Sequence, residues 1–309
     1  MNWGLDSLRK HAGNPILSPQ GDGWESRAVF NPAAWTDGRQ VYLLYRAEGV
    51  SSFPDRAFTS RIGLAVSTDG IHFTRDPLPV LEPTEPFEIP GGCEDPRLVR
   101  IGDTFYMTYT AYDGGVARLA MAVSRDLRRW EKWGLLFPDD RWEHFFPHEE
   151  HRRLFPRGWS KSGAILQQPL DGRYWMFFGD SHIWAASSTD LRGWDVVPEP
   201  VLSPRMGFFD ARLVEPGPPP LMLLEGIWLG YNAADADLRY AFGQALFAPD
   251  NPTIVVRRCT RPLLEPVTPE EIAGQVPNVV FGEGMVRFRE RWLLYYGMAD
   301  SRIGVAMKD

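Results

Sequence analysis

The chain has 309 residues, of which 44% are hydrophobic and 24% are charged, a composition typical of a folded protein with a sizeable core. Its net charge of −7 argues against nucleic acid as a partner, because binding a phosphate backbone requires a basic surface. The two cysteines are too few for a disulfide framework, and no apolar run suits a signal peptide or a membrane span. We therefore expect a cytoplasmic protein with neither a membrane partner nor a nucleic-acid partner.

The residue counts of 12 Trp, 10 Tyr, 18 Phe, 29 Gly and 27 Pro predict an all-β protein. Aromatic residues favour strands, whereas Gly and Pro favour turns. Along the chain, an aromatic-rich segment with the pattern of a buried strand recurs five times. The copies are Val41–Tyr45, Thr104–Tyr109, Arg173–Phe178, Gly226–Tyr231 and Arg291–Tyr296.

Two shorter phrases accompany these segments. One begins with Ser-x-Asp, whose side chains can bond to the backbone of a tight turn, and ends in an aromatic residue. It occurs at Ser67–Phe73, Ser124–Trp130 and Ser188–Trp194. The other is a short closing phrase rich in Pro and Leu. It occurs at Pro15–Pro19, Pro79–Pro83, Gly134–Pro138, Pro200–Pro204 and Pro262–Pro266.

These repeats predict a five-bladed β-propeller that occupies residues 1–309 as a single domain, with one blade every ~45 to 70 residues. The expected blades begin near Asn31, Asp95, Lys161, Asp210 and Val279. The last blade has no closing phrase of its own, so we expect the N-terminal strand to complete it and close the ring. A β-sandwich is the alternative, although it gives no reason for five matched units.

The first strand of each blade in a propeller lines the central channel, where a polar side chain has no packing role. The polar residues on these predicted strands are therefore the candidates for a binding or catalytic site, and they would converge from different blades. Ion pairing within the channel wall is the alternative explanation for each of them. The candidates are Asn31, Asp95, Arg97, Lys161, Asp210, Arg212 and Glu283.

Such a set of charged and amide groups suits the cleavage of a glycosidic bond. Cleavage with inversion needs a carboxylic acid that protonates the leaving oxygen, while the nucleophile arrives from the opposite face. A hydrolase needs a second carboxylate as the base, whereas a phosphorylase needs cations that hold phosphate. The balance of carboxylates and cations around the acid should therefore separate the two reactions.

Several motifs resemble glycoside hydrolase family 130. They are Glu94–Gly102, Asn31–Ala34, Tyr45–Ala47, Ser60–Gly63, Pro218–Pro220 and Tyr295–Asp300. The resemblance covers nearly the whole chain. It implies a five-bladed propeller that acts on β-mannosides, either as a phosphorylase or as a hydrolase.

The resemblance also implies roles for individual residues. Asp95 matches the general acid, which in this family delivers its proton through a hydroxyl of the bound mannose. Asn31, Arg46 and Asp300 match positions that hold the sugar, and Arg61 lies in a matching arginine motif. The implied substrate is an oligosaccharide or small glycoside.

The phosphate-binding positions match less well. The chain has Phe178-Gly179-Asp180 where phosphorylases have His-Arg-Pro, and Tyr231-Asn232-Ala233 where they have Tyr-His-Gly. Arg212 stands at a lysine position, and Lys161 keeps a cation at the start of the third blade. Losing a bidentate arginine should weaken phosphate binding, so these differences favour hydrolysis or another acceptor. We predict no cofactor, with inorganic phosphate as a possible co-substrate.

A hydrolase would need a base, and Glu283 is the first candidate because the two glycines beside it suggest a close approach of the backbone to another group. Glu215 and Asp180 follow, with Asp180 otherwise assigned to substrate binding. The alternative for Glu283 is an ion pair with an arginine of the channel.

Other interpretations remain open at this stage. The chain could be a non-catalytic glycan-binding propeller, or a hydrolase of arabinofuranosides or fructosides that uses Asp95, Asp210 and Glu283. His144, His148 and His151 are close in sequence but lack the spacing of a zinc site, so we predict no metal site. The segment Val267–Gln275 predicts a short surface helix, and the sequence leaves a homo-oligomer open.

Overall fold

The computed structural model describes residues 5, 7–51, 53–54, 56–138 and 159–308. Within these residues almost all regular structure is β, as predicted. The helix α2 spans Pro269–Ile272, inside the predicted helical segment, and Glu271 caps its start by accepting a hydrogen bond from the backbone N–H of Thr268. No helix among the described residues is long and apolar enough to cross a membrane.

The largest sheet combines two antiparallel meanders. Each meander has four strands in sequence order, and a single parallel bridge between Ser60 and Gly92 joins them. The first meander contains β2 (Ala28–Thr36), β3 (Val41–Val50), β4 (Phe58–Ser67) and β5 (Thr74–Arg75). The second contains β6 (Gly92–Ile101), β7 (Thr104–Tyr112), β8 (Ala117–Ser124) and β9 (Glu131–Leu135).

The next two sheets repeat this pattern with shorter first strands. One contains β10 (Ala164–Ile165), β11 (Tyr174–Phe178), β12 (Trp184–Ser188) and β13 (Asp195–Val196). The other contains β14 (Leu213–Pro216), β15 (Leu221–Leu223), β16 (Gly226–Ala234), β17 (Tyr240–Ala248) and β18 (Asn251–Arg258). Both β14 and β15 pair with β16.

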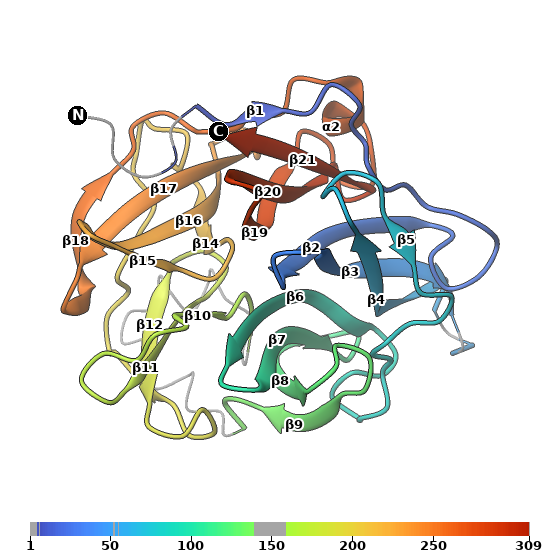
Figure 1. The fold of residues 1–309 in the computed structure, drawn as a ribbon, viewed down its shortest axis with the longest axis horizontal. Coiled ribbons are helices and arrows are strands. Elements are labelled where there is room, and N and C mark those ends of the chain that lie inside the picture. Colours follow the sequence, from blue (N-terminus) through green and yellow to red (C-terminus); the bar gives the residue numbers. More distant parts are fainter. Residues whose placement is uncertain (1–4, 6, 52, 55, 139–158, 309) are drawn as a thin grey trace.

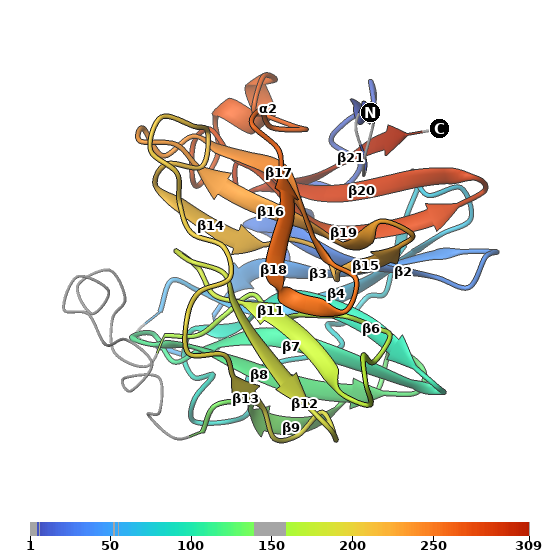
Figure 2. The ribbon, with the colours of Figure 1, turned by 90° about the vertical axis from the view of Figure 1, so that its left-hand side faces the viewer.

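The last sheet brings the two ends of the chain together. It contains β19 (Val280–Phe288), β20 (Arg291–Met298), β21 (Arg302–Lys308) and the N-terminal β1 (Arg9–Lys10). Because β1 pairs antiparallel with β21, the prediction that an N-terminal strand completes the last sheet is confirmed. In Figure 1 the sheets lie around a common middle, and β2, β6, β10, β14 and β19 are the strands nearest to it. Figure 2 shows the sheets from the side.

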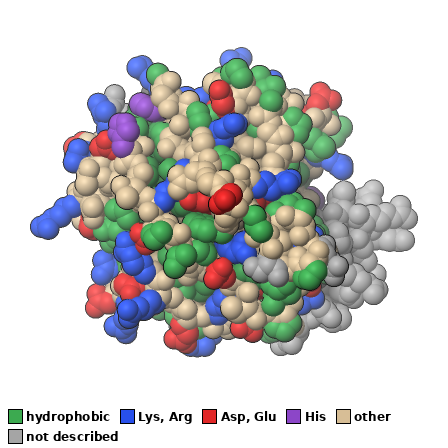
Figure 3. All heavy atoms as spheres, turned by 90° about the vertical axis from the view of Figure 1, so that its right-hand side faces the viewer, with side chains coloured by type: hydrophobic (Ala, Val, Ile, Leu, Met, Phe, Trp, Pro, Cys, Tyr) green, Lys and Arg blue, Asp and Glu red, His purple; other side chains and the backbone are tan. Residues whose placement is uncertain are grey.

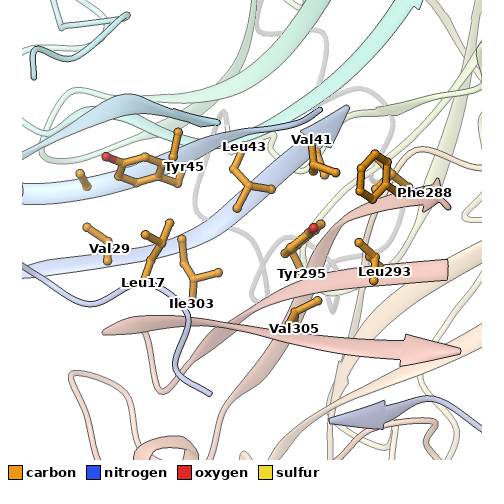
Figure 4. Close-up of a cluster of buried hydrophobic side chains, with 14 residues drawn as sticks. Leu17, Val29, Val41, Leu43, Tyr45, Phe288, Leu293, Tyr295, Ile303 and Val305 are labelled. Carbon is orange, nitrogen blue, oxygen red and sulfur yellow. The ribbon is translucent and has the colours of Figure 1, made fainter. Parts of the chain in front are cut away.

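The hydrophobic core lies between neighbouring sheets rather than in one central mass. Figure 4 shows one such layer, in which Val29 and Leu43 face Tyr295 and Val305 from the last sheet. All four are fully buried. Burying an apolar side chain of this size stabilises the fold by about 1.5–3 kcal/mol, so each layer holds two adjacent sheets together. On the surface face in Figure 3, basic and acidic side chains are interspersed.

The predicted Ser-x-Asp turns form as expected. At the first of them the Asp69 carboxylate accepts hydrogen bonds from the backbone N–H groups of Ile71 and His72, and Ser67 Oγ accepts one from Gly70. The same arrangement recurs after β8 and β12. The repeated phrase in the sequence therefore marks a repeated local structure.

The attachment of β1 gives a stability prediction. Lys10 Nζ lies 2.6 Å from a carboxylate oxygen of the fully buried Glu271. We expect Lys10→Ala to lower the free energy of unfolding by about 3 kcal/mol, because it leaves a buried charge without its cation. Arg9→Ala, at the exposed neighbouring position, is the matched control and should change it by less than about 0.5 kcal/mol. Urea denaturation measures both, and equal effects would contradict the importance of the ion pair.

Candidate active site

A small polar pocket of about 160 Å³ is lined by residues from eight separate stretches of the chain. It contains five residues predicted for the site and five others. The predicted residues are Asn31, Arg46, Asp95, Lys161 and Asp300, and the others are Glu215, Tyr240, Val276, Val279 and Phe281. Residues up to 269 positions apart in sequence therefore meet at one place.

Bulges in the first strands direct two of the key side chains. Asn31 lies at a shift of register in β2, and Asp95 lies at the corresponding shift in β6. Their φ angles are +46° and +48°, a left-handed conformation that Asn and Asp tolerate better than most residues. Because a bulge inserts one extra residue, it changes the direction in which the side chain points. The bulges explain why Asn31 and Asp95 line a pocket rather than pack within a sheet.

Asp95 is held in a network of polar contacts. Asn31 Nδ2 donates a hydrogen bond of 2.9 Å to Asp95 Oδ1, and Arg46 Nη1 lies 3.3 Å from the same oxygen. Burial raises the pKa of Asp95, but Arg46, Lys161 and the Asn31 hydrogen bond together hold it below its usual value. The carboxylate of the free pocket is therefore ionised at neutral pH.

Arg46 is shared among several carboxylates. Its Nη2 lies 2.7 Å from Glu48 and 2.9 Å from Glu94, in addition to the contact with Asp95. Burial raises the pKa of Glu94 to about 7, against the opposing effect of Arg46, and it raises the pKa of Asp300 to about 7 as well. A proton is thus available beside the ionised Asp95 at neutral pH.

The opposite wall combines Lys161, Glu215 and Tyr240. Lys161 Nζ lies 3.5 Å from Asp180, and nearby carboxylates raise the pKa of Lys161 against the effect of burial. The buried Glu215 accepts a hydrogen bond from Ser162 Oγ, and burial raises its pKa despite the nearby Lys161. Asp180 thus stands next to the pocket through Lys161, although it does not line the pocket itself.

Glu283 and Arg97 lie behind the pocket wall rather than on it. Both are almost fully buried, with Arg97 Nη1 3.5 Å from Glu283. Arg97 also donates hydrogen bonds to the carbonyl oxygens of Gly217 and Pro216, which links β6 to the end of β14. Glu283 therefore pairs with an arginine of the channel, which is the alternative to a role as the base. Burial raises the pKa of Glu283 well above its usual value.

Three other predicted residues do not line the pocket. Arg61 is buried and pairs with Glu82 at 3.1 Å. Asp210 is fully buried between Arg205 and Arg258, so its carboxylate is used in a structural cluster. Arg212 is exposed and precedes β14. Asp210 and Arg212 both precede β14, and the residue of this strand that lines the pocket is Glu215.

Sequence reasoning placed Glu215 only among the alternative bases and missed Tyr240. Tyr240 is the first residue of β17, at a position for which the repeats gave no signal. Asn232 stands where the family resemblance implies a histidine in phosphorylases. It is buried, and its side-chain amide donates a hydrogen bond to the carbonyl oxygen of Gly282 and accepts one from the Gly282 N–H. It therefore joins β16 to β19. His144, His148 and His151 lie outside the described residues.

The chain is similar in sequence and in structure to known carbohydrate-active enzymes. The family described as beta-1,4-mannooligosaccharide phosphorylase matches residues 7–309. A 1,2-beta-oligomannan phosphorylase from Thermoanaerobacter sp. (strain X514) is 33% identical over 98% of each chain. A glycosyl hydrolase structure from Bacteroides ovatus is 35% identical with a TM-score of 0.86, over 99% of this chain and 94% of that one.

A further solved structure comes from work on glycoside hydrolases within the GH130 family of mannoside phosphorylases, enzymes that target β-1,2-mannosidic linkages in Candida mannan. It is 36% identical to this chain with a TM-score of 0.88, and the match covers 100% of this chain and 95% of that one. These matches extend over nearly the whole chain. The protein is therefore an enzyme of glycoside hydrolase family 130, whose members are glycosidases and glycoside phosphorylases.

Proposed function

We propose that this enzyme cleaves a β-mannoside with inversion, that water is the nucleophile, and that Asp95 is the general acid. The observation that carries the choice of water is the charge of the pocket. Its described lining has three carboxylates, Asp95, Glu215 and Asp300, against two cations, Arg46 and Lys161. Both cations already contact carboxylates, so a phosphate dianion would have to compete with those carboxylates for them.

We also propose that the sheets form a closed five-bladed propeller in a single domain. The four-stranded meanders in sequence order and the pairing of β1 with β21 support it. In such a ring the first strands face the centre, which agrees with the position of Asn31 on β2 and Asp95 on β6. The site is then assembled from several blades.

In the proposed reaction, the bond between the anomeric carbon and the leaving oxygen breaks as that oxygen receives a proton. Asp95 is ionised in the free pocket, so the proton must first reach it from nearby. Asp300 and Glu94 share Arg46 with Asp95 and have pKa values of about 7, which makes them the nearest source. A substrate hydroxyl bound to Asp95 can carry the proton to the leaving oxygen, as the family resemblance implies.

The base accepts a proton from the attacking water on the other face of the sugar. Glu215 is our first candidate because it lies on the pocket wall and because burial raises its pKa, which makes it a stronger base than an ordinary carboxylate. Glu283 is the second candidate, although it lies behind the wall against Arg97. Asn31 and Arg46 position the sugar, and the size of the pocket suits one sugar ring.

Phosphorolysis is the second candidate reaction, because the relative that is 33% identical is a phosphorylase. In that reaction Lys161 would contact the phosphate, and the product would be mannose 1-phosphate rather than mannose.

The two reactions are separated by their products. With β-1,2- and β-1,4-linked mannosides as substrates, we expect free mannose at the same rate with and without inorganic phosphate. Chromatography and a mannose 1-phosphate assay measure the outcome. Mannose 1-phosphate formed only in the presence of phosphate would overturn hydrolysis, and the absence of cleavage on every mannoside would overturn the substrate class.

A further inference from the structure

The turn that carries Asp300 is conformationally unusual. It links β20 to β21, and both Ala299 and Asp300 have left-handed φ angles, +47° and +50°. This conformation costs roughly 1–2 kcal/mol for each residue other than glycine, so neighbouring groups must stabilise the turn. The position of the Asp300 carboxylate in the pocket depends on those groups.

The loop between α2 and β19, residues 273–279, packs directly on this turn. The backbone N–H of Val276 donates to the carbonyl oxygen of Ala299, and that of Gln275 donates to Ser301 Oγ. Gly274 lies so close to Ala299 that a Cβ at this position would collide with the Ala299 carbonyl oxygen. The loop also contributes Val276 to the lining of the pocket.

Gln275 uses both ends of its side-chain amide in this region. Its Nε2 donates to the backbone oxygen of Asp300 at 2.8 Å and to Glu48 Oε2 at 3.0 Å. Its Oε1 accepts a hydrogen bond of 2.7 Å from Arg27 Nε. Glu48 in turn pairs with Arg46, the cation that contacts Asp95. An exposed residue outside the pocket is thus connected to two residues that line it.

We infer that Gln275 is a positioning residue of the active site, which fixes the Asp300 turn and the Glu48–Arg46 pair relative to each other. An exposed glutamine has no packing reason to bond to two separate strands, and its three contacts join β3 to the β20–β21 turn. This inference rests on the proposed function, in which Arg46 positions the sugar and Asp300 is a source of the proton that reaches Asp95.

Two substitutions test it. Gln275→Glu keeps the size of the side chain but places a carboxylate against Glu48 and the Asp300 carbonyl oxygen. Gln275→Ala removes the contacts without adding charge. Because a misplacement of ~1 Å can cost up to ~100-fold in rate, we expect kcat/KM to fall ~10- to 100-fold in Gln275→Glu. The thermal midpoint should stay close to that of the parent, since the side chain is exposed.

Gln40→Glu, at the far end of β2 and β3, is the matched control and should keep the parent's kinetics.

A second readout does not depend on the substrate. The titration of Asp300 can be followed by carbon NMR in the ligand-free protein, with Asp300→Asn for assignment. In Gln275→Ala, water should reach the loosened turn, and the pKa of Asp300 should fall from about 7 toward its usual value. The charged and titratable groups that face Asp300 from other elements stay the same in this variant. They are Arg46, Glu48, Asp95, Lys161 and Tyr240.

The outcomes separate the two proposals. Parent-like kinetics together with a parent-like Asp300 titration in the Gln275 variants would overturn the positioning role. A parent enzyme that cleaves no mannoside would overturn the proposed function alone, because the NMR titration would still test the contact between Gln275 and the Asp300 turn. A lower thermal midpoint with unchanged titration and unchanged KM would indicate a purely structural role and would also overturn the inference.

Discussion

Asp95→Asn is expected to lower kcat by ~10²- to 10⁴-fold, the usual contribution of a general acid. The amide keeps the shape of the carboxyl group and can still contact Asn31 and Arg46, but it cannot release a proton to the leaving oxygen. Arg46 also keeps Glu48 and Glu94 as partners, so the fold should persist in the variant. Steady-state kinetics on the mannoside that the parent cleaves best give the result.

Asp103→Asn is a suitable control for this variant. Asp103 follows the same strand, β6, but its side chain is exposed and contacts Arg100 at 3.4 Å. It should retain the parent's kcat. A leaving group of low pKa, such as dinitrophenolate, should restore part of the activity of Asp95→Asn because it needs no proton. Full activity of Asp95→Asn on a natural mannoside would remove Asp95 as the acid.

The sequence predicted the sheets well because the signals for them are local and repeated. The turn phrase after β4, β8 and β12 forms the same hydrogen bonds three times, so each copy supported the interpretation of the others. The pairing of β1 with β21 was also predictable, since the Pro15–Pro19 phrase had no blade of its own. The four-residue length of α2 was less predictable, because the capping pattern marks where a helix starts rather than where it ends.

The site was predicted less completely, and the reason is the direction of side chains. The sequence located the first strands, but on β2 and β6 a bulge decides which residue points into the pocket. On β2 and β6 the expected residues Asn31 and Asp95 coincide with the bulges. On β19 the bulge lies at Glu283, which nevertheless faces the buried Arg97. Whether a carboxylate faces the pocket or pairs with an arginine depends on residues of a neighbouring sheet. The sequence pattern of a single strand does not show which residues those are.

The sheet formed by β14 to β18 shows the same limit in another form. Asp210 and Arg212 precede β14, and both matched the expected polar pattern of a first strand. Asp210 instead forms a buried cluster with Arg205 and Arg258, whereas Glu215, five residues later, reaches the pocket. Arg258 comes from the end of β18, far from Asp210 in sequence, so its ion pair with the buried Asp210 could not be predicted from the pattern around Asp210.

Glu215→Gln provides the strongest test of which carboxylate is the base. If Glu215 accepts the proton of the attacking water, the variant should lose ~10²- to 10⁴-fold in kcat for hydrolysis. Azide needs no base, so it should restore cleavage by attacking the anomeric carbon as the leaving oxygen departs, and inversion should give an α-mannosyl azide. Nuclear magnetic resonance of the product identifies its configuration.

Glu283→Gln is the necessary comparison, because Glu283 is the second candidate and lies on another strand. Its side chain lies against the buried Arg97 and does not line the pocket, so azide should have no effect on the rate of this variant. If azide instead rescues Glu283→Gln and leaves Glu215→Gln unchanged, the base is Glu283. The ion pair with Arg97 must then open when substrate binds, because only a carboxylate released from Arg97 could receive the proton of water.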